Sequence, residues 1–176
     1  ALSYKEKEII VVDDSTDRTP EIVKEYASRG VRLIRGKREG CCEAVNTGIE
    51  AATGDIIVQA DADVRPPKDF LERLAEKYEA GADWVLVDSR LPDWNRKSIF
   101  HRFIGALHIA DHPPARTDMY YQEAFSVRRD LALKLGNFEP SYPARFCRDW
   151  FLGKKLTEGK YKKVYDRSII VLHPQP

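Results

Sequence analysis

Short β-branched runs that alternate with helical patterns constrain the fold of this chain more than any other feature. The run Ile9-Ile10-Val11-Val12 shows no polar alternation, which is typical of a strand buried on both faces. Thr19 and Pro20 then open a helix as its N-cap and first residue. The same alternation recurs with strands over 31–34, 55–60 and 83–87, and helices from Ala44 and from Pro66-Pro67. It predicts an α/β fold with a mainly parallel twisted sheet and helices on both faces.

The second half of the sequence gives a weaker pattern. We expect a helix over 99–109, a loop over 112–119, a strand over 124–127, helices over 130–135 and 149–157, and a strand over 168–172. The apolar stripe of the first helix would be Ile22, Val23, Tyr26 and Ala27. No linker divides the 176 residues, so a single domain is expected.

Charge and cysteine content exclude some functions. With 29 basic and 28 acidic residues the net charge is +1, which gives no electrostatic basis for binding nucleic acid. The three cysteines, two of them adjacent at Cys41-Cys42, form neither a disulfide framework nor a zinc motif. No apolar run of about 18 residues is present. We therefore expect reduced thiols in a cytoplasmic protein, free or at the inner face of the membrane.

Two acidic pairs follow two of the expected strands. Asp13-Asp14 ends the first, and Asp61-Ala62-Asp63 ends the strand over 55–60. In an open α/β sheet the carboxyl ends of parallel strands form the ligand-binding edge, so both pairs would face one crevice. Carboxylates this close repel unless a cation lies between them. The spacing predicts a site for a divalent cation.

Two basic residues, Lys37 and Arg38, lie in the loop after the strand over 31–34 and could reach the same edge. Carboxylates, a hard divalent cation and basic side chains together suit a diphosphate. Each part alone has a simpler interpretation: the acidic pairs as turn residues and the basic pair as a solvated loop. Their occurrence together, in this order, favours a binding site.

Four segments carry a resemblance to a known family. They are "EIIVVDDSTDRT", "GCCEAVNTGIEAATGDIIVQADADVRPPKDFL", "GNFEP" and "RDWFLGKKLTEGKY…VLH". They resemble the successive motifs of the inverting family 2 glycosyltransferases of GT-A fold, a Rossmann-like nucleotide-diphospho-sugar transferase fold. The resemblance implies that residues 1–87 form the nucleotide-sugar-binding half and residues 88–176 the acceptor-binding half.

The resemblance also implies roles for individual residues. Asp14, with Asp13 beside it, would contact the base and ribose of the donor. Asp61 and Asp63 would hold Mg or Mn on the donor diphosphate. The remaining implied residues are His173, which would complete the metal shell, and Asp149, the general base, with Glu123 and Asp118 as the next candidates.

The implied activity is metal-dependent, inverting transfer of one sugar from a UDP- or GDP-sugar to an acceptor hydroxyl. The acceptor would be a saccharide or a lipid-linked molecule. A Gln-x-x-Arg-Trp motif, typical of processive polysaccharide synthases, is absent after Asp149, so single-sugar transfer is expected. The resemblance further implies a strand and helix before Glu8, in the middle of the sheet. We therefore expect the natural chain to be longer, at its N-terminus and, as in relatives with membrane helices, at its C-terminus.

Other functions remain open at this level. The segment "IIVQADADV" also fits the nucleophile motif of haloacid-dehalogenase-like phosphatases, with Asp61 as nucleophile and Asp63 as acid. A pyrophosphorylase on a related fold is a further possibility. A non-catalytic sugar-nucleotide-binding module is a third, because Arg148 and Phe151 stand where the family carries acids.

Overall fold

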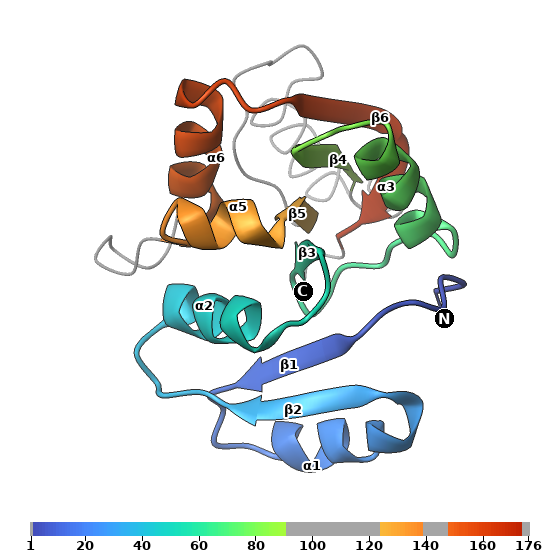
Figure 1. Ribbon diagram of the computed structural model, residues 1–176. Coiled ribbons are helices and arrows are strands. Elements are labelled where there is room, and N and C mark those ends of the chain that lie inside the picture. The colour runs from blue at the N-terminus through green and yellow to red at the C-terminus, as the bar shows by residue number, and fades with distance from the viewer. Residues whose placement is uncertain (1, 91–123, 139–147, 174–176) are drawn as a thin grey trace, which may run out of the picture.

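The computed structural model describes residues 2–90, 124–138 and 148–173, and shows strands and helices arranged in layers (Figure 1). The elements are β1 (Ile9–Asp13), α1 (Thr19–Lys24), a 3-10 helix η1 (Ala27–Arg29), β2 (Val31–Arg35), α2 (Cys41–Ala51), β3 (Ile56–Ala60), α3 (Phe70–Glu79), β4 (Trp84–Arg90), β5 (Ala124–Arg128), α5 (Arg129–Lys134), α6 (Arg148–Glu158) and β6 (Lys163–Leu172). The predicted α/β class is confirmed.

The strands form two sheets. β1 pairs with β2 in parallel, and the second sheet has the order β3-β5-β4-β6. β4 and β6 are parallel, whereas β5 runs antiparallel to both β3 and β4. The expectation of a mainly parallel sheet is confirmed, since β3, β4 and β6 share one direction and β5 runs against them. Within the described residues no strand pairs with the second edge of β1 or of β3.

Helices cover both faces of the four-stranded sheet, as expected. Successive residues of β4 alternate between two buried clusters: Trp84 and Leu86 in one, Val85 and Val87 in the other. The first cluster also contains residues of α2, α5 and α6, and the second contains the apolar face of α3. All four of these β4 side chains are at most 1% exposed, so this strand is buried on both faces.

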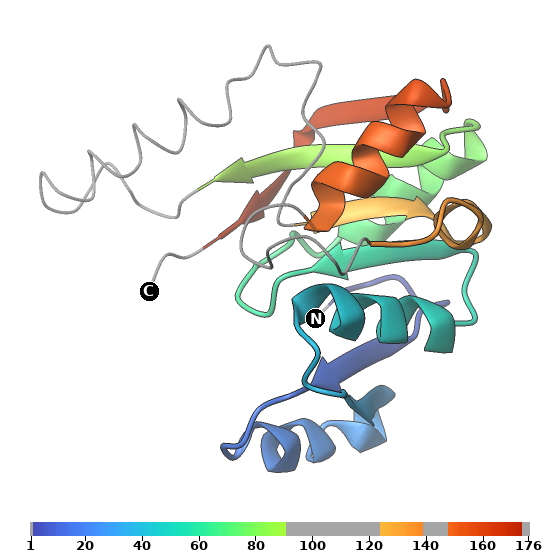
Figure 2. The same cartoon turned by 90° about the vertical axis from the view of Figure 1, so that its left-hand side faces the viewer.

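Figure 2 shows β1, β3, β4 and β6 pointing in the same direction. Their carboxyl ends therefore lie on one side of the molecule. This arrangement brings the residues after β1, β3 and β6 to a common edge, the edge at which open α/β sheets bind ligands.

The first helix differs from its prediction. Its N-cap is Arg18, and Thr19 is its first residue, with a backbone N–H that donates to Asp17 Oδ1 over 2.9 Å. Ile22 is 49% and Tyr26 is 44% exposed, so the predicted apolar stripe is not buried. Among the described residues α1 packs mainly on β1 and β2 of the two-stranded sheet, and this leaves much of its apolar surface exposed.

Other boundaries shift by a few residues. α3 begins at Phe70, after Pro66 and Pro67, and β6 begins at Lys163, five residues before the predicted strand over 168–172. β6 extends because it pairs with β4 on both sides of a register shift between Val87 and Asp88. The predicted helix over 99–109 and loop over 112–119 lie outside the described residues. Among the described helices, none has the length and apolarity needed to cross a bilayer.

Candidate donor-binding site

The two carboxylates at the end of β1 have different environments. Asp13 is 6% exposed, and its Oδ2 accepts a hydrogen bond from Arg35 Nη1 over 2.5 Å. Arg35 ends β2 directly opposite Asp13 in the parallel register. The Asp13 Oδ1 accepts from the backbone N–H of Ser15 over 3.3 Å. Both carboxylate oxygens of Asp13 therefore accept hydrogen bonds from other groups of the protein.

Asp14 lies against the turn that follows β2. Its Oδ1 accepts the backbone N–H of Arg38 over 3.0 Å. A Cβ atom on Gly36 would lie 2.2 Å from the same oxygen, so any other residue there would displace the Asp14 carboxylate. Arg38 has a φ of 63°, in the left-handed region that costs free energy for a side chain of this size. Strained backbone of this kind gathers at binding sites.

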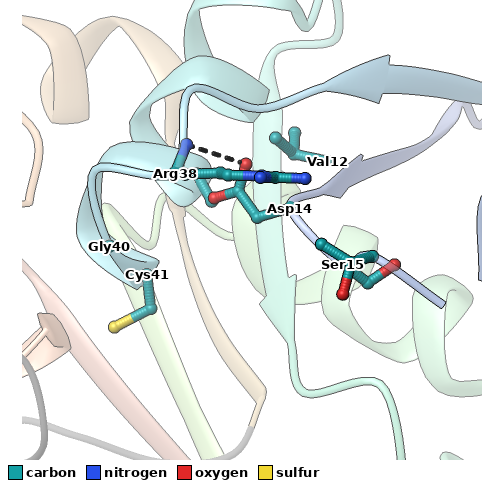
Figure 3. Close-up of a pocket in the computed structure, with 8 residues that line it drawn as sticks. Val12, Asp14, Ser15, Arg38, Gly40 and Cys41 are labelled. Carbon is teal, nitrogen blue, oxygen red and sulfur yellow. Dashed lines mark hydrogen bonds between the residues drawn. The ribbon is translucent and has the colours of Figure 1, made fainter.

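A pocket of about 590 Å³ opens beside Asp14. Figure 3 shows Asp14 and Arg38 joined by their hydrogen bond, with the Arg38 side chain extended across toward Val12. Gly40 and Cys41, at the start of α2, form another part of the lining. A second pocket of about 420 Å³ shares Ser15, Thr16 and Arg38 with the first. The predicted donor residues Asp14 and Arg38 thus lie together.

Lys37 points elsewhere. Its Nζ lies 3.0 Å from Glu43 Oε1, and it is not among the residues that line either pocket. The hydrogen bond and charge of Glu43, with the charge of Glu39, raise the pKa of Lys37. Lys37 therefore stays protonated at neutral pH, but in this structure it neutralises Glu43.

At the edge of the second sheet, Asp63 meets His173. His173 Nε2 lies 3.2 Å from Asp63 Oδ1. Backbone pairing brings them together: the Arg65 N–H donates to the Leu172 carbonyl over 2.7 Å, and the Leu172 N–H donates back over 3.0 Å. Arg65, two residues after Asp63, is thus joined to Leu172, the residue before His173. The structure therefore places two of the three predicted metal ligands side by side.

The third predicted ligand, Asp61, accepts a hydrogen bond from Gln59 Nε2 over 3.1 Å. In residues 2–90, 124–138 and 148–173, no three His, Cys, Asp or Glu side chains are grouped closely enough to hold a metal ion. Carboxylate oxygens are nevertheless ligands that Mg and Mn prefer, so the two acids after β3 fit the predicted cation by their chemistry.

The acceptor side is described only in outline. Asp149 is the second residue of α6, and its side chain lies outside what the structure describes. Asp118 and Glu123, the alternative candidates for a base, lie outside the described residues. The Asp149 assignment therefore stays a prediction.

Sequence reasoning missed Arg35, Gly36 and Asn46. Asn46 is 8% exposed; its Nδ2 donates to the Phe138 carbonyl over 2.8 Å and its Oδ1 accepts the Phe138 N–H over 2.9 Å. It ties α2 to the "GNF" turn. The sequence did contain a signal for Arg35. It ends the second strand as Asp13 ends the first, and a parallel pair of two five-residue strands places these last residues opposite each other.

Comparison with known proteins decides the family. A family model described as "Glycosyl transferase family 2" matches residues 1–138, most of the chain. The chain belongs to glycosyl transferase family 2. This assignment agrees with the predicted GT-A fold and argues against the phosphatase interpretation of Asp61, because the acidic motif after β3 matches as part of the glycosyltransferase family.

Relatives of this family 2 chain include two curated proteins. It is 40% identical over 93 residues to a dolichol-phosphate mannosyltransferase of Pyrococcus furiosus, over 51% of this chain and 26% of that protein. It is 34% identical over 100 residues to an undecaprenyl-phosphate 4-deoxy-4-formamido-L-arabinose transferase of Edwardsiella ictaluri, over 53% of this chain and 31% of that protein. The matches thus span less than a third of each relative.

A solved structure extends the similarity to nearly the whole chain. It is a mannosyltransferase of Pyrobaculum calidifontis in complex with GDP-Man and Mn²⁺. The TM-score is 0.71 at 27% identity, covering 96% of this chain and 48% of that protein. The GT-A architecture of the family 2 chain is thereby confirmed.

Proposed function

We propose that this chain binds a nucleoside-diphosphate sugar and a divalent cation, and transfers one sugar to an acceptor with inversion. The observation that carries the proposal is the common edge of the molecule, where the Asp14 pocket follows β1 and the Asp63–His173 pair follows β3 and β6. In this proposal the nucleoside lies at the Asp14 pocket and the diphosphate at the Asp63–His173 pair.

Each residue has a distinct task in this proposal. Asp14 accepts hydrogen bonds from the donor nucleoside, and Arg38 bounds the pocket in which the nucleoside lies. Asp61, Asp63 and His173 would hold Mg or Mn on the diphosphate. When bound, the ion neutralises the charge that the departing diphosphate gains in the transition state. Lys37 would reach the diphosphate only after leaving Glu43, so its contribution is smaller than that of Arg38.

The names of the relatives support this function. The Pyrobaculum structure holds GDP-Man and Mn²⁺, and the two curated relatives are named as transferases acting with dolichol phosphate and undecaprenyl phosphate. We carry over the donor class and the cation to this chain as a proposal. We further propose one domain, with residues 1–87 as the donor half and 88–176 as the acceptor half, that acts in the cytoplasm at the inner face of the membrane.

Two kinds of acceptor make different demands on the chemistry. A hydroxyl group is a poor nucleophile, so a carboxylate such as Asp149 must take its proton as it attacks. A lipid-linked phosphate, which the names of the relatives favour, is ionised near neutral pH and needs no base. Arg148, in place of an acid beside Asp149, suits an anionic acceptor.

Calorimetry with UDP and with GDP, each with Mn²⁺ or with excess chelator, tests donor binding. We expect one nucleotide to bind with Mn²⁺ and much more weakly in chelator, and Asp61→Asn to weaken this binding. Equal affinity in both conditions would contradict a metal-bridged diphosphate. Tight binding without transfer to any acceptor would favour the non-catalytic module, and a donor screen by mass spectrometry identifies the sugar.

Asp149→Asn separates the two acceptors. With a hydroxyl acceptor, loss of the base should lower the transfer rate by about 100-fold or more and leave donor binding unchanged. With a phosphate acceptor, the rate should change little. Steady-state rates with a saccharide acceptor and with a polyprenyl phosphate give the comparison.

A further inference from the structure

Arg35 joins the two residues that flank Asp14. Its Nη1 donates to Asp13 Oδ2 and its Nη2 donates to the carbonyl oxygen of Ser15, each over 2.5 Å. The guanidinium thus holds the turn after β1 on both sides of Asp14. Because the two bonds leave separate nitrogens of one planar fork, the single nitrogen of a lysine would not reproduce this geometry.

The rest of the Asp14 environment comes from the same turn. The backbone N–H of Gly36 donates to the Asp13 carbonyl over 3.1 Å, and that of Arg38 donates to Asp14 Oδ1 over 3.0 Å. Residues 35–38 therefore hold the 13–15 turn in place through hydrogen bonds. Without Arg35, the two segments would keep these two hydrogen bonds, each donated by a backbone N–H.

We propose that Arg35 is a positioning residue of the donor site: by clamping Asp13 and Ser15 it fixes the direction in which Asp14 faces the pocket. This inference rests on the proposed function, because it concerns the affinity of the site for a nucleoside diphosphate. Arg35 acts through Asp13, whose nearly buried carboxylate would otherwise lack a charged partner at this position. The buried acid of the Asp13-Asp14 pair is thus an anchor, and the second acid is the ligand contact.

A direct contact between Arg35 and the donor is the competing explanation, since Arg35 also borders the smaller pocket. A double-mutant cycle separates the two. If Arg35 works through the clamp on Asp13 and Ser15, then removing Arg35 after Asp13 has been neutralised costs less than it does in the wild type, because part of the clamp is already lost. If Arg35 touches the donor, the two losses add.

Arg32 provides a matched control on the same strand. It is also an arginine of β2 and is similarly exposed, but it interacts with Glu8 and with the Ala51 carbonyl, away from the pocket. Neither pocket is lined by Arg32. Arg32→Gln removes the same charge from the same strand without touching the clamp.

The experiment is calorimetry of UDP and GDP with Mn²⁺, with thermal unfolding measured for every variant. Arg35→Gln should raise Kd by about tenfold, within the range of coupling between contacting residues. Arg35→Lys should raise Kd similarly, and Arg32→Gln should not change it. The variants compared are R35Q, R35K, D13N, the double variant D13N/R35Q, and R32Q.

The double variant should lose less binding free energy than the sum of the losses of its two parents. Additive losses, or an Arg35→Gln Kd within twofold of the wild type, would overturn the positioning role and leave the proposed function intact. A wild-type protein that binds neither nucleotide would overturn both. If Arg35→Gln does not fold, Arg35→Lys and Asp13→Asn carry the same comparison, because R35K keeps the charge and loses the fork.

Discussion

Gly36 leaves no room for a side chain beside Asp14. A Cβ there would lie 2.2 Å from Asp14 Oδ1 and 2.8 Å from its Cγ, whereas ordinary contacts begin near 3.4 Å. In Gly36→Ala, the carboxylate must therefore move by about 1.2 Å, the difference between 3.4 and 2.2 Å. Such a shift breaks the hydrogen bond from the Arg38 N–H and turns Asp14 away from the pocket.

The expected loss follows from the contact that Asp14 would make. A hydrogen bond to a charged group contributes about 1.5–3 kcal/mol, so losing one to the donor raises Kd by about 10- to 100-fold. The backbone tolerates alanine, since Gly36 is not among the residues with positive φ. Alanine also reduces the entropy of the unfolded chain, which offsets the local strain by about 0.4–1 kcal/mol. Binding should fall while stability changes little.

Calorimetry with the preferred nucleotide and Mn²⁺ measures the first effect, and urea unfolding the second. Gly48→Ala is the control, because a Cβ there meets Val12 Cγ2 at an ordinary 3.5 Å within α2. It should bind the nucleotide like the wild type and be more stable by about 1 kcal/mol. The reasoning is refuted if Gly36→Ala binds within twofold of the wild type, or if both alanine variants lose binding equally.

Three further outcomes are expected. His173→Ala should raise the Mn²⁺ concentration needed for half-maximal nucleotide binding by about tenfold or more, without affecting binding in chelator; an unchanged Mn²⁺ titration would remove His173 from the metal site. Asn46→Asp should lower the unfolding free energy by about 2 kcal/mol in urea titrations, because an oxygen replaces the donor that bonds the Phe138 carbonyl. Burial raises the pKa of Asp166, but the bonds from Lys77 and Ser168 outweigh it and lower the pKa from 3.8 to about 2. This ion pair should stabilise the protein by about 1 kcal/mol above pH 4, and the contribution should disappear as the pH falls toward 2; a difference between Asp166→Asn and the wild type that does not shrink with falling pH would contradict it.

The sequence predicted most of the elements because their patterns are local. Strands such as Ile9–Asp13 and Trp84–Arg90 are short β-branched or aromatic runs, and α2 carries a clear apolar periodicity. The direction of β5 came from the structure alone, because a five-residue segment carries no information on which way a strand runs. The apolar stripe of α1 was wrong, since burial depends on what covers a helix and not on its own pattern.

In the candidate site too, the sequence indicated which residues take part, and the structure was needed to distinguish their roles. Asp14, Arg38, Asp61 and Asp63 could be identified from the sequence, because acids and bases that follow strand ends are expected at the carboxyl edge of the sheet. Their individual tasks could not. Asp13 and Asp14 are adjacent and identical, and only their contacts show that Asp13 is clamped by Arg35 while Asp14 lines the pocket.

By itself, then, the sequence determined the α/β class, the chemistry available at the strand ends and the family motifs, since all three are encoded in contiguous segments. The tertiary structure alone decided which distant residues meet. His173 reaches Asp63 through the backbone pairing of Arg65 with Leu172, and Asn46 holds Phe138. Such contacts depend on strand order and register, and these are set by the packing of the whole core rather than by any local pattern.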